Sequence, residues 1–173
     1  MMTRREGMAV LGLGLAAAPF AAADGAPVTP DMGAPTARFV FEAQVDIAPT
    51  EDLGDSALGR RRIVPILGGS FAGPDIRGKV RPGGADRQLV RPDGVRQLHA
   101  LYEIETDDGA VLTISNRVMI DEPAGGPRYA VSVIEITAPK GRYDWMNRRI
   151  FVGTLATMRP ARQAVRIRVF VME

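Results

Sequence analysis

Apolar and polar residues alternate with a period of two along most of this chain, and this alternation restricts it to folds built from β-strands. A strand places successive side chains on opposite faces of its sheet, so alternation marks a segment with one buried face. The clearest case spans 98–106, where Leu98, Tyr102 and Ile104 share a face. After residue 23, no window of about 12 residues has the 3.6-residue period of an amphipathic helix. The sequence therefore predicts an all-β protein.

About ten such segments follow one another at a spacing of roughly ten residues, as in sandwiches and barrels. Consecutive hairpins, one of them turning at Asp107–Gly109, favour an up-and-down order, and closure removes the exposed edge strands. We therefore predict a closed antiparallel up-and-down β-barrel of about ten strands with little helix. The expected strands span 39–47, 63–67, 76–80, 88–90, 98–106, 111–120, 129–137, 150–157 and 165–171, with a loop at 49–59, a glycine-rich turn or bulge at 68–74 and a helical turn at 143–148.

The N-terminal segment has the composition of an export signal. Arg4 and Arg5 precede an apolar run over 8–18, which is too short to span a membrane, and small residues follow at 21–23. Paired arginines favour the twin-arginine route over the general secretory route. We predict a signal peptide over 1–23, a disordered leader over 24–37 and a β-barrel domain over 38–173. The expected location is the periplasm or the cell exterior, with no stable membrane insertion after cleavage.

Several function classes are disfavoured by what the chain lacks. It has no cysteine, which excludes disulfides and thiolate catalysis, and its one histidine, His99, cannot supply the usual nitrogen ligands of a metal site. The 22 basic and 20 acidic residues nearly balance, without the basic, aromatic-rich stripe that binds nucleic acid. A dinucleotide-like glycine pattern at 12–17 follows no strand and lies inside the predicted signal. We expect no metal, no cofactor and no nucleic-acid partner.

Three strands carry a polar side chain on an otherwise apolar face. Tyr102 shares its face with Leu98, while Arg117 and Glu135 follow the register of apolar residues in 111–119 and 131–133. Charges in a barrel lumen are costly unless paired, so they tend to mark sites. A carboxylate there would have its pKa raised by desolvation and lowered by a nearby arginine, which suits acid–base catalysis. Alternation does not distinguish the lumen from the outer surface, so both placements stay open.

Two motifs resemble those of a known family. The first joins the glycine-rich stretch 68–74 to the segment 78–86, and the second joins 143–147 to 151–153. With Tyr102, the turn at 106–109 and the pair Asn116-Arg117, they make residues 39–171 similar to the family catalogued as domain of unknown function 3237. The resemblance implies a closed antiparallel β-barrel of about ten strands, often dimeric, with a central cavity. Because members are often dimeric, the resemblance also implies a homodimer as a partner arrangement. It implies no established activity.

The resemblance also suggests which side chains line the cavity. Residues that match motif positions are Asp86, Arg117, Glu135, Trp145 and Asn147. Arg87 stands where the family often has tryptophan, which changes the aromatic wall of the pocket. Most members also lack an export signal, so the compartment would be a specialisation of this chain.

Two functions follow from this set. The first is a binding module that holds a small, partly apolar ligand in the barrel, with Asp86, Tyr102, Arg117, Glu135, Trp145 and Asn147 as expected ligand-binding residues. The second is a cofactor-free lyase or isomerase. Asp86 or Glu135 would be its general base and Arg117 would stabilise an oxyanion. A third alternative, a structural partner protein, predicts a filled barrel and a large exposed apolar patch.

Overall fold

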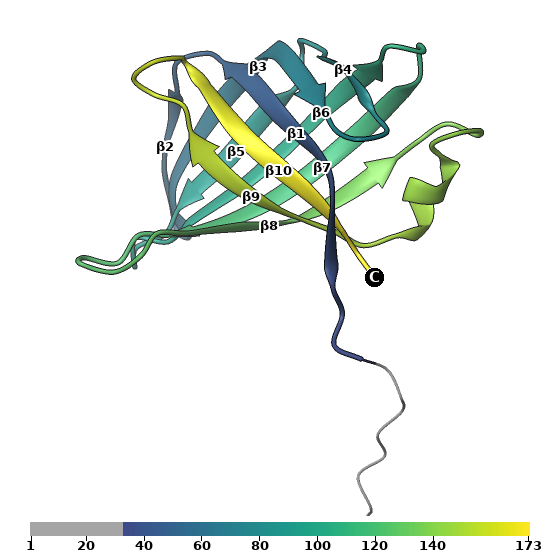
Figure 1. Ribbon diagram of the computed structural model, residues 1–173. Helices are drawn as coiled ribbons and strands as arrows, with labels where there is room; N and C mark the ends of the chain where they lie inside the picture. The colour runs from purple at the N-terminus through teal and green to yellow at the C-terminus, as the bar shows by residue number, and fades with distance from the viewer. Residues whose placement is uncertain (1–32) are drawn as a thin grey trace, which may run out of the picture. The chain divides into compact units, whose positions relative to one another are not determined.

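A computed structural model describes residues 33–173, which form ten strands in one antiparallel sheet (Figure 1). The sheet closes into a barrel because β1 pairs with β10 on one edge and with β3 on the other. The strands from β6 to β10 follow one another as a meander, and β4 and β5 share the position between β3 and β6. The predicted closed antiparallel barrel is confirmed. The strands are β1 (Ala37–Ile47), β2 (Glu51–Ser56), β3 (Gly59–Ala72), β4 (Arg77–Val80), β5 (Ala85–Val90), β6 (Arg96–Thr106), β7 (Val111–Asp121), β8 (Tyr129–Thr137), β9 (Phe151–Thr157) and β10 (Ala164–Met172).

Two segments differ from the sequence expectation. The expected loop at 49–59 contains β2, whose six residues are all exposed, so no alternation marks it as a strand. The glycine-rich turn or bulge expected at 68–74 is present only in part: β3 runs on to Ala72 with a register shift against β1 beside Gly68, and a turn follows at 73–76. Gly68 and Gly69 both have positive φ there, and β3 exchanges its neighbours at this point. Its first half pairs with β2 and β5, and its second half pairs with β1 and β4.

The lumen is divided into a filled half and an open half. Large buried side chains fill one half, and the five-residue 3-10 helix η1 (Asp144–Arg148) closes that end by inserting Met146, with the adjacent Tyr143 also buried. The expected helical turn over 143–148 is therefore present. Among the fully buried side chains of the filled half are Phe41, Ile104, Leu112, Phe151 and Val171. The other half holds the cavity described below.

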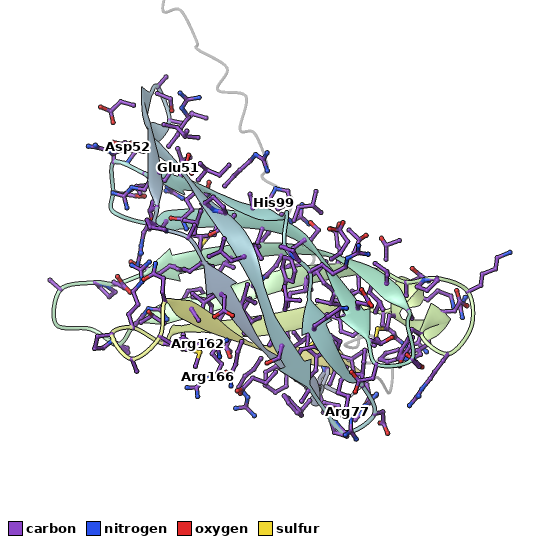
Figure 2. The ribbon with its side chains drawn as sticks, turned by 90° about the horizontal axis from the view of Figure 1, so that it is seen from above. Glu51, Asp52, Arg77, His99, Arg162 and Arg166 are labelled. Carbon is purple, nitrogen blue, oxygen red and sulfur yellow. The ribbon has the colours of Figure 1, made fainter. Side chains whose placement is uncertain are left out.

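The outer face of the barrel carries most of the charged side chains. Figure 2 shows Asp52, Arg162 and Arg166 at the periphery of the barrel. Opposite charges lie together there; for example, Nε of Arg162, in the loop between β9 and β10, lies 2.7 Å from Asp46 Oδ1 on β1. Such exposed pairs contribute little to the free energy of unfolding.

The predicted signal peptide and most of the predicted leader lie outside the described residues. At the start of the described chain, the backbone of Thr36 exchanges two hydrogen bonds with the backbone of Glu173, of 2.7 and 2.9 Å. The described part of the chain contains no helix that is long and apolar enough to cross a membrane. Export and the location that follows from it stay predictions.

Candidate functional site

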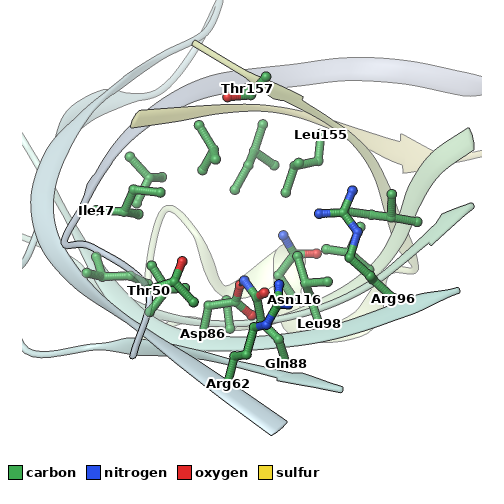
Figure 3. A pocket seen from close by; sticks show the side chains of 18 of the residues that line it. Ile47, Thr50, Arg62, Asp86, Gln88, Arg96, Leu98, Asn116, Leu155 and Thr157 are labelled. Carbon is green, nitrogen blue, oxygen red and sulfur yellow. The ribbon is translucent and has the colours of Figure 1, made fainter. Parts of the chain in front are cut away.

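The open half of the lumen encloses a cavity of about 350 Å³ (Figure 3). Its walls come from strands far apart in the sequence, from β1 to β10, and are mainly apolar. Figure 3 shows Asp86, Gln88 and Arg62 together on one wall, with Leu155 and Thr157 on the opposite wall. A mainly apolar cavity with a few convergent polar groups is the usual form of a small-molecule site. The apolar lining includes Val45, Ile66, Ala100, Val118 and Ile167.

Two polar side chains stand at one level of this cavity. Asp86 on β5 lies opposite Ala100 on β6, and Ala100 lies opposite Asn116 on β7. All three line the cavity. Neighbouring strands are about 4.8 Å apart, so the Asp86 and Asn116 backbones are separated by roughly 10 Å. Because Ala100 is small, space remains between the carboxyl and the amide for a polar group of a bound molecule.

The Asp86 carboxyl is only partly satisfied. Its Oδ2 atom accepts a 2.7 Å hydrogen bond from Gln88 Nε2, whereas its Oδ1 atom is buried without a partner in the described part of the chain. Burial raises the pKa of Asp86 to about 6, although the Gln88 amide and the His99 backbone N–H partly oppose this shift. At neutral pH the group is therefore mostly ionised and still able to accept a proton, as a general base requires.

Asn116 is the second unsatisfied group. The side chain is 1% exposed, and neither its Oδ1 nor its Nδ2 atom has a hydrogen-bond partner among the described residues. An unpaired buried amide destabilises a protein by about 1–3 kcal/mol, so such groups are uncommon and call for an explanation. A ligand that donates to Oδ1 and accepts from Nδ2 would satisfy both atoms.

Four arginines and one glutamate surround the mouth of the cavity. Glu122 is held between Arg96 and Arg128, each with a nitrogen 2.7 Å from a Glu122 oxygen. The Arg128 hydrogen bond, together with the charges of both arginines, keeps the pKa of Glu122 below its usual range. Arg62 and Arg159 also line the cavity. Neither of their guanidinium groups has a salt-bridge partner in residues 33–173.

The structure brings only two of the sequence-predicted site residues to this cavity. Asp86 lies on its wall, and Tyr102 lies at its floor, 2% exposed, where burial raises the pKa of the phenol well above its usual range. Arg117 and Glu135 instead point outward, with side chains 58% and 65% exposed. They form a 2.6 Å salt bridge with each other on the outer face. The expectation that they line the lumen is wrong, because the inward positions of β7 and β8 are the alternate ones.

Trp145 and Asn147 lie at the closed end of the barrel, away from the cavity. Trp145 packs against Phe151, with ring centroids 5.8 Å apart. The Asn147 side chain accepts from the Ala138 backbone N–H at 2.9 Å and donates to the Ala138 carbonyl at 3.0 Å. Both residues hold η1 against the barrel. Their expected position at the central cavity is therefore wrong, because this segment folds over the filled half of the lumen.

The outward position of Arg117 leads to a first prediction. Arg117→Gln should leave ligand binding in the lumen unchanged and lower the free energy of unfolding by less than about 1 kcal/mol, because exposed ion pairs are weak. Urea unfolding monitored by circular dichroism measures the second quantity. A loss of several kcal/mol would contradict the exposed position of this pair.

Sequence reasoning missed Asn116, although the sequence contained a signal for it. Asn116 is the one polar residue among the inward positions of β7, between Ile114 and Val118. The mouth residues were missed for a different reason. Arg62, Arg96 and Arg128 lie near strand ends, where charged residues are common and alternation gives no information. Within residues 33–173, no three histidine or acidic side chains gather as metal ligands would.

Comparison with known proteins places the fold in a family. The model of the family described as protein of unknown function (DUF3237) matches residues 35–172. The chain belongs to this family. A UPF0311 protein of Rhodopseudomonas palustris is 35% identical over 132 residues, which cover 69% of this chain and 86% of that protein. The crystal structure of a conserved protein of unknown function from Rhodopseudomonas palustris superposes with a TM-score of 0.76 at 32% identity, covering 84% of this chain and all of that one.

The family also has a relative with a named activity. A protein of Penicillium herquei named hydroalkoxylation enzyme phnH is 29% identical over 120 residues, covering 69% of this chain and 74% of that protein. The resemblance to the family stated from the glycine-rich and aromatic motifs is thus confirmed. This chain is a small β-barrel protein of the DUF3237 family.

Proposed function

We propose that the barrel binds a small, partly apolar molecule in the open half of its lumen, with a polar group of that molecule between Asp86 and Asn116. The observation that carries this proposal is the buried Asn116 amide, which has no partner among the described residues and faces a cavity of about 350 Å³. The apolar walls would take up the body of the ligand, since each buried CH₂ group contributes about 0.8 kcal/mol.

A hollow on the outer face of β6, β7 and β8 is a weaker candidate. It is larger, about 650 Å³, and is bordered by exposed apolar residues such as Met119 and Val133. Two polar pairs on this face are already formed: His99 Nε2 lies 3.1 Å from Ser115 Oγ, and Arg117 pairs with Glu135. A structural partner protein would have a filled barrel, whereas half of this lumen is open. The homodimer that the family resemblance implies stays a prediction.

A second candidate function is favoured by the raised pKa of Asp86. In this case the bound molecule would lose a proton to the Asp86 carboxylate, as in a cofactor-free lyase or isomerase. The name of the Penicillium herquei relative supports the same type of chemistry. Hydroalkoxylation adds an O–H bond across a carbon–carbon double bond, and a base that takes the hydroxyl proton and returns it to carbon would serve this reaction. Glu135 cannot fill this role, because it lies outside the barrel.

Filling the space above Ala100 tests the lumen site. Ala100→Phe places a ring between Asp86 and Asn116, whereas Leu101→Phe places one on the outer face, where Leu101 is 47% exposed. The probe is para-hydroxycinnamamide, an uncharged, flat molecule about 10 Å long. We expect it to stabilise the wild type and Leu101→Phe by about 2.7 kcal/mol at about 100 times its Kd, and not to stabilise Ala100→Phe.

Thermal shift and isothermal titration calorimetry measure this difference. The cavity has room for the added ring, so Ala100→Phe should remain folded, which far-UV circular dichroism checks. If the probe binds Ala100→Phe as tightly as the wild type, its site is outside the lumen and the proposal fails.

A further inference from the structure

We propose that the natural ligand is a carboxylate, whose charged end is held at the mouth by Arg62 and Arg159 while an uncharged hydroxyl end reaches Asp86 and Asn116. This inference rests on the proposed lumen site and adds the chemical class of the ligand. It is based on the charge at the mouth, on the depth at which each polar group lies, and on two arginines that have no salt-bridge partner in residues 33–173.

The charge around the cavity is strongly positive. Four arginines line it, against the two carboxylates of Glu122 and Asp86. Glu122 is already shared by Arg96 and Arg128. The Asp52 carboxylate on β2 lies opposite Arg62 in register, but its salt bridge is with Arg60, and Arg62 adds only a smaller charge effect to the lowered pKa of Asp52. The Arg62 and Arg159 guanidinium groups are thus the cations available to an incoming molecule.

Asp86 does not neutralise Arg62. Arg62 pairs in register with Gln88, one inward position closer to the mouth than Asp86. The groups that lower the pKa of Asp86 are the Gln88 amide and the His99 backbone, with no contribution from an arginine. The positive charge of Arg62 is therefore not used by the lumen carboxylate, although both side chains belong to the same wall (Figure 3).

The spacing of these groups suits an elongated molecule. Successive inward positions on a strand are separated by about 7 Å, so Arg62 lies roughly that far above the level of Asp86 and Asn116. A planar guanidinium binds a carboxylate through two parallel hydrogen bonds. Arg62 is half-buried, and this position strengthens its attraction for a carboxylate. At the other end, a hydroxyl could donate to Asp86 and accept from the Asn116 amide. Apolar walls between the two levels would contact the body of the ligand.

A pair of probes that differ only in charge tests the inference. The wild type is titrated with para-hydroxycinnamate and with para-hydroxycinnamamide by isothermal titration calorimetry. We expect the acid to bind roughly tenfold more tightly than the amide, because it gains a charge-assisted hydrogen-bonded pair. The double variant Arg62→Gln/Arg159→Gln should reduce this ratio to about one and leave amide binding unchanged. The control Arg117→Gln, which removes an outer arginine, should keep the ratio of the wild type.

Salt provides a second readout. Binding of the acid should weaken as ionic strength rises, and binding of the amide should not, because only the acid depends on unscreened charge. Equal affinity of the wild type for both probes overturns the carboxylate inference, as does an unchanged ratio in the double variant. In either case, loss of binding in Ala100→Phe would still support the lumen site. If neither probe binds the folded wild type, the lumen site fails and the inference fails with it.

Discussion

Asp86→Asn is expected to raise the free energy of unfolding at about pH 7 by about 3 kcal/mol, while removing the polar contact on which the lumen site depends. The pKa of Asp86 is about 6 in the folded protein, against 3.8 for an ordinary aspartate carboxyl in water. Each unit of pKa difference corresponds to about 1.4 kcal/mol between the two protonation states. Asparagine has a similar shape and no charge to desolvate.

The direction of the pH dependence follows from the raised pKa. A group with a higher pKa in the folded state binds its proton more tightly there, so its stabilising contribution is complete below about pH 4. This contribution is lost as pH rises through the folded-state pKa of about 6. The variant should therefore exceed the wild type most clearly at about pH 7 and match it near pH 4. Other carboxylates titrate in both proteins, so only the difference between them is compared.

Urea unfolding at several pH values measures this difference. Glu135→Gln is the matched control, because it removes a carboxylate from the outer face of the barrel. It should change the free energy of unfolding by less than about 1 kcal/mol at any of these pH values. If Asp86→Asn is no more stable than the wild type at about pH 7, the carboxyl is hydrated in the folded protein. Its assignment as a desolvated base would then be wrong.

A gain in stability from removing a charged side chain would itself bear on function. A charge buried at a cost of stability, across the cavity from an Asn116 amide that has no partner in residues 33–173, is the pattern expected where a site has been kept at the expense of the fold. If proton transfer is the activity, the same substitution should remove turnover, whereas a pure binding module would lose only affinity. Asp86→Asn therefore also separates the two functions proposed for the lumen.

The sequence predicted the strands of the barrel well because alternation and turns depend on local chemistry. The paired strands β6 and β7 were expected within two residues of their observed ends, since each has a regular inward face. Alternation failed to indicate which face of β7 is inward, because both faces are partly apolar: Met119 is 45% exposed, whereas Ile120 is buried. Only the closure of the sheet, which is a long-range property, decides that Asn116 is inside and Arg117 outside.

The site residues divide in the same way. Asp86 was predicted because it ends a glycine-rich motif. That Asn116 lies at the same depth of the lumen could not be predicted without the register of β5, β6 and β7. Trp145 and Asn147 lie in a family motif and close the other end of the barrel. A motif match does not show whether a residue has such a structural role or binds a ligand. The arginines at the mouth come from four distant segments and share no sequence pattern.

The seam that closes the barrel supplies the prediction with the largest effect on the fold. At Gly69 on β3, φ is +136°, and a Cβ atom would lie 2.0 Å from the backbone oxygen of Gln44 on β1. Backbone atoms in a paired strand cannot move aside without breaking the β1–β3 ladder, in which Gly69 lies opposite Val45. Gly69→Ala should therefore destabilise the protein by about 2–6 kcal/mol, combining backbone strain with overpacking.

Gly83→Ala separates these two causes. Gly83 also has a positive φ, of 106°, but a Cβ atom there would meet nothing within 4 Å. The Gly83→Ala substitution should lower the free energy of unfolding only by the backbone strain, about 1–3 kcal/mol, as measured by the same urea unfolding. Hydrogen exchange adds a local test, because Gly69→Ala should speed the exchange of β1 amides more than that of β7 amides. If both variants lose the same stability, close approach of β1 and β3 does not limit residue 69. The glycine would then be required for its backbone angle alone, as in an ordinary bulge within a continuous strand.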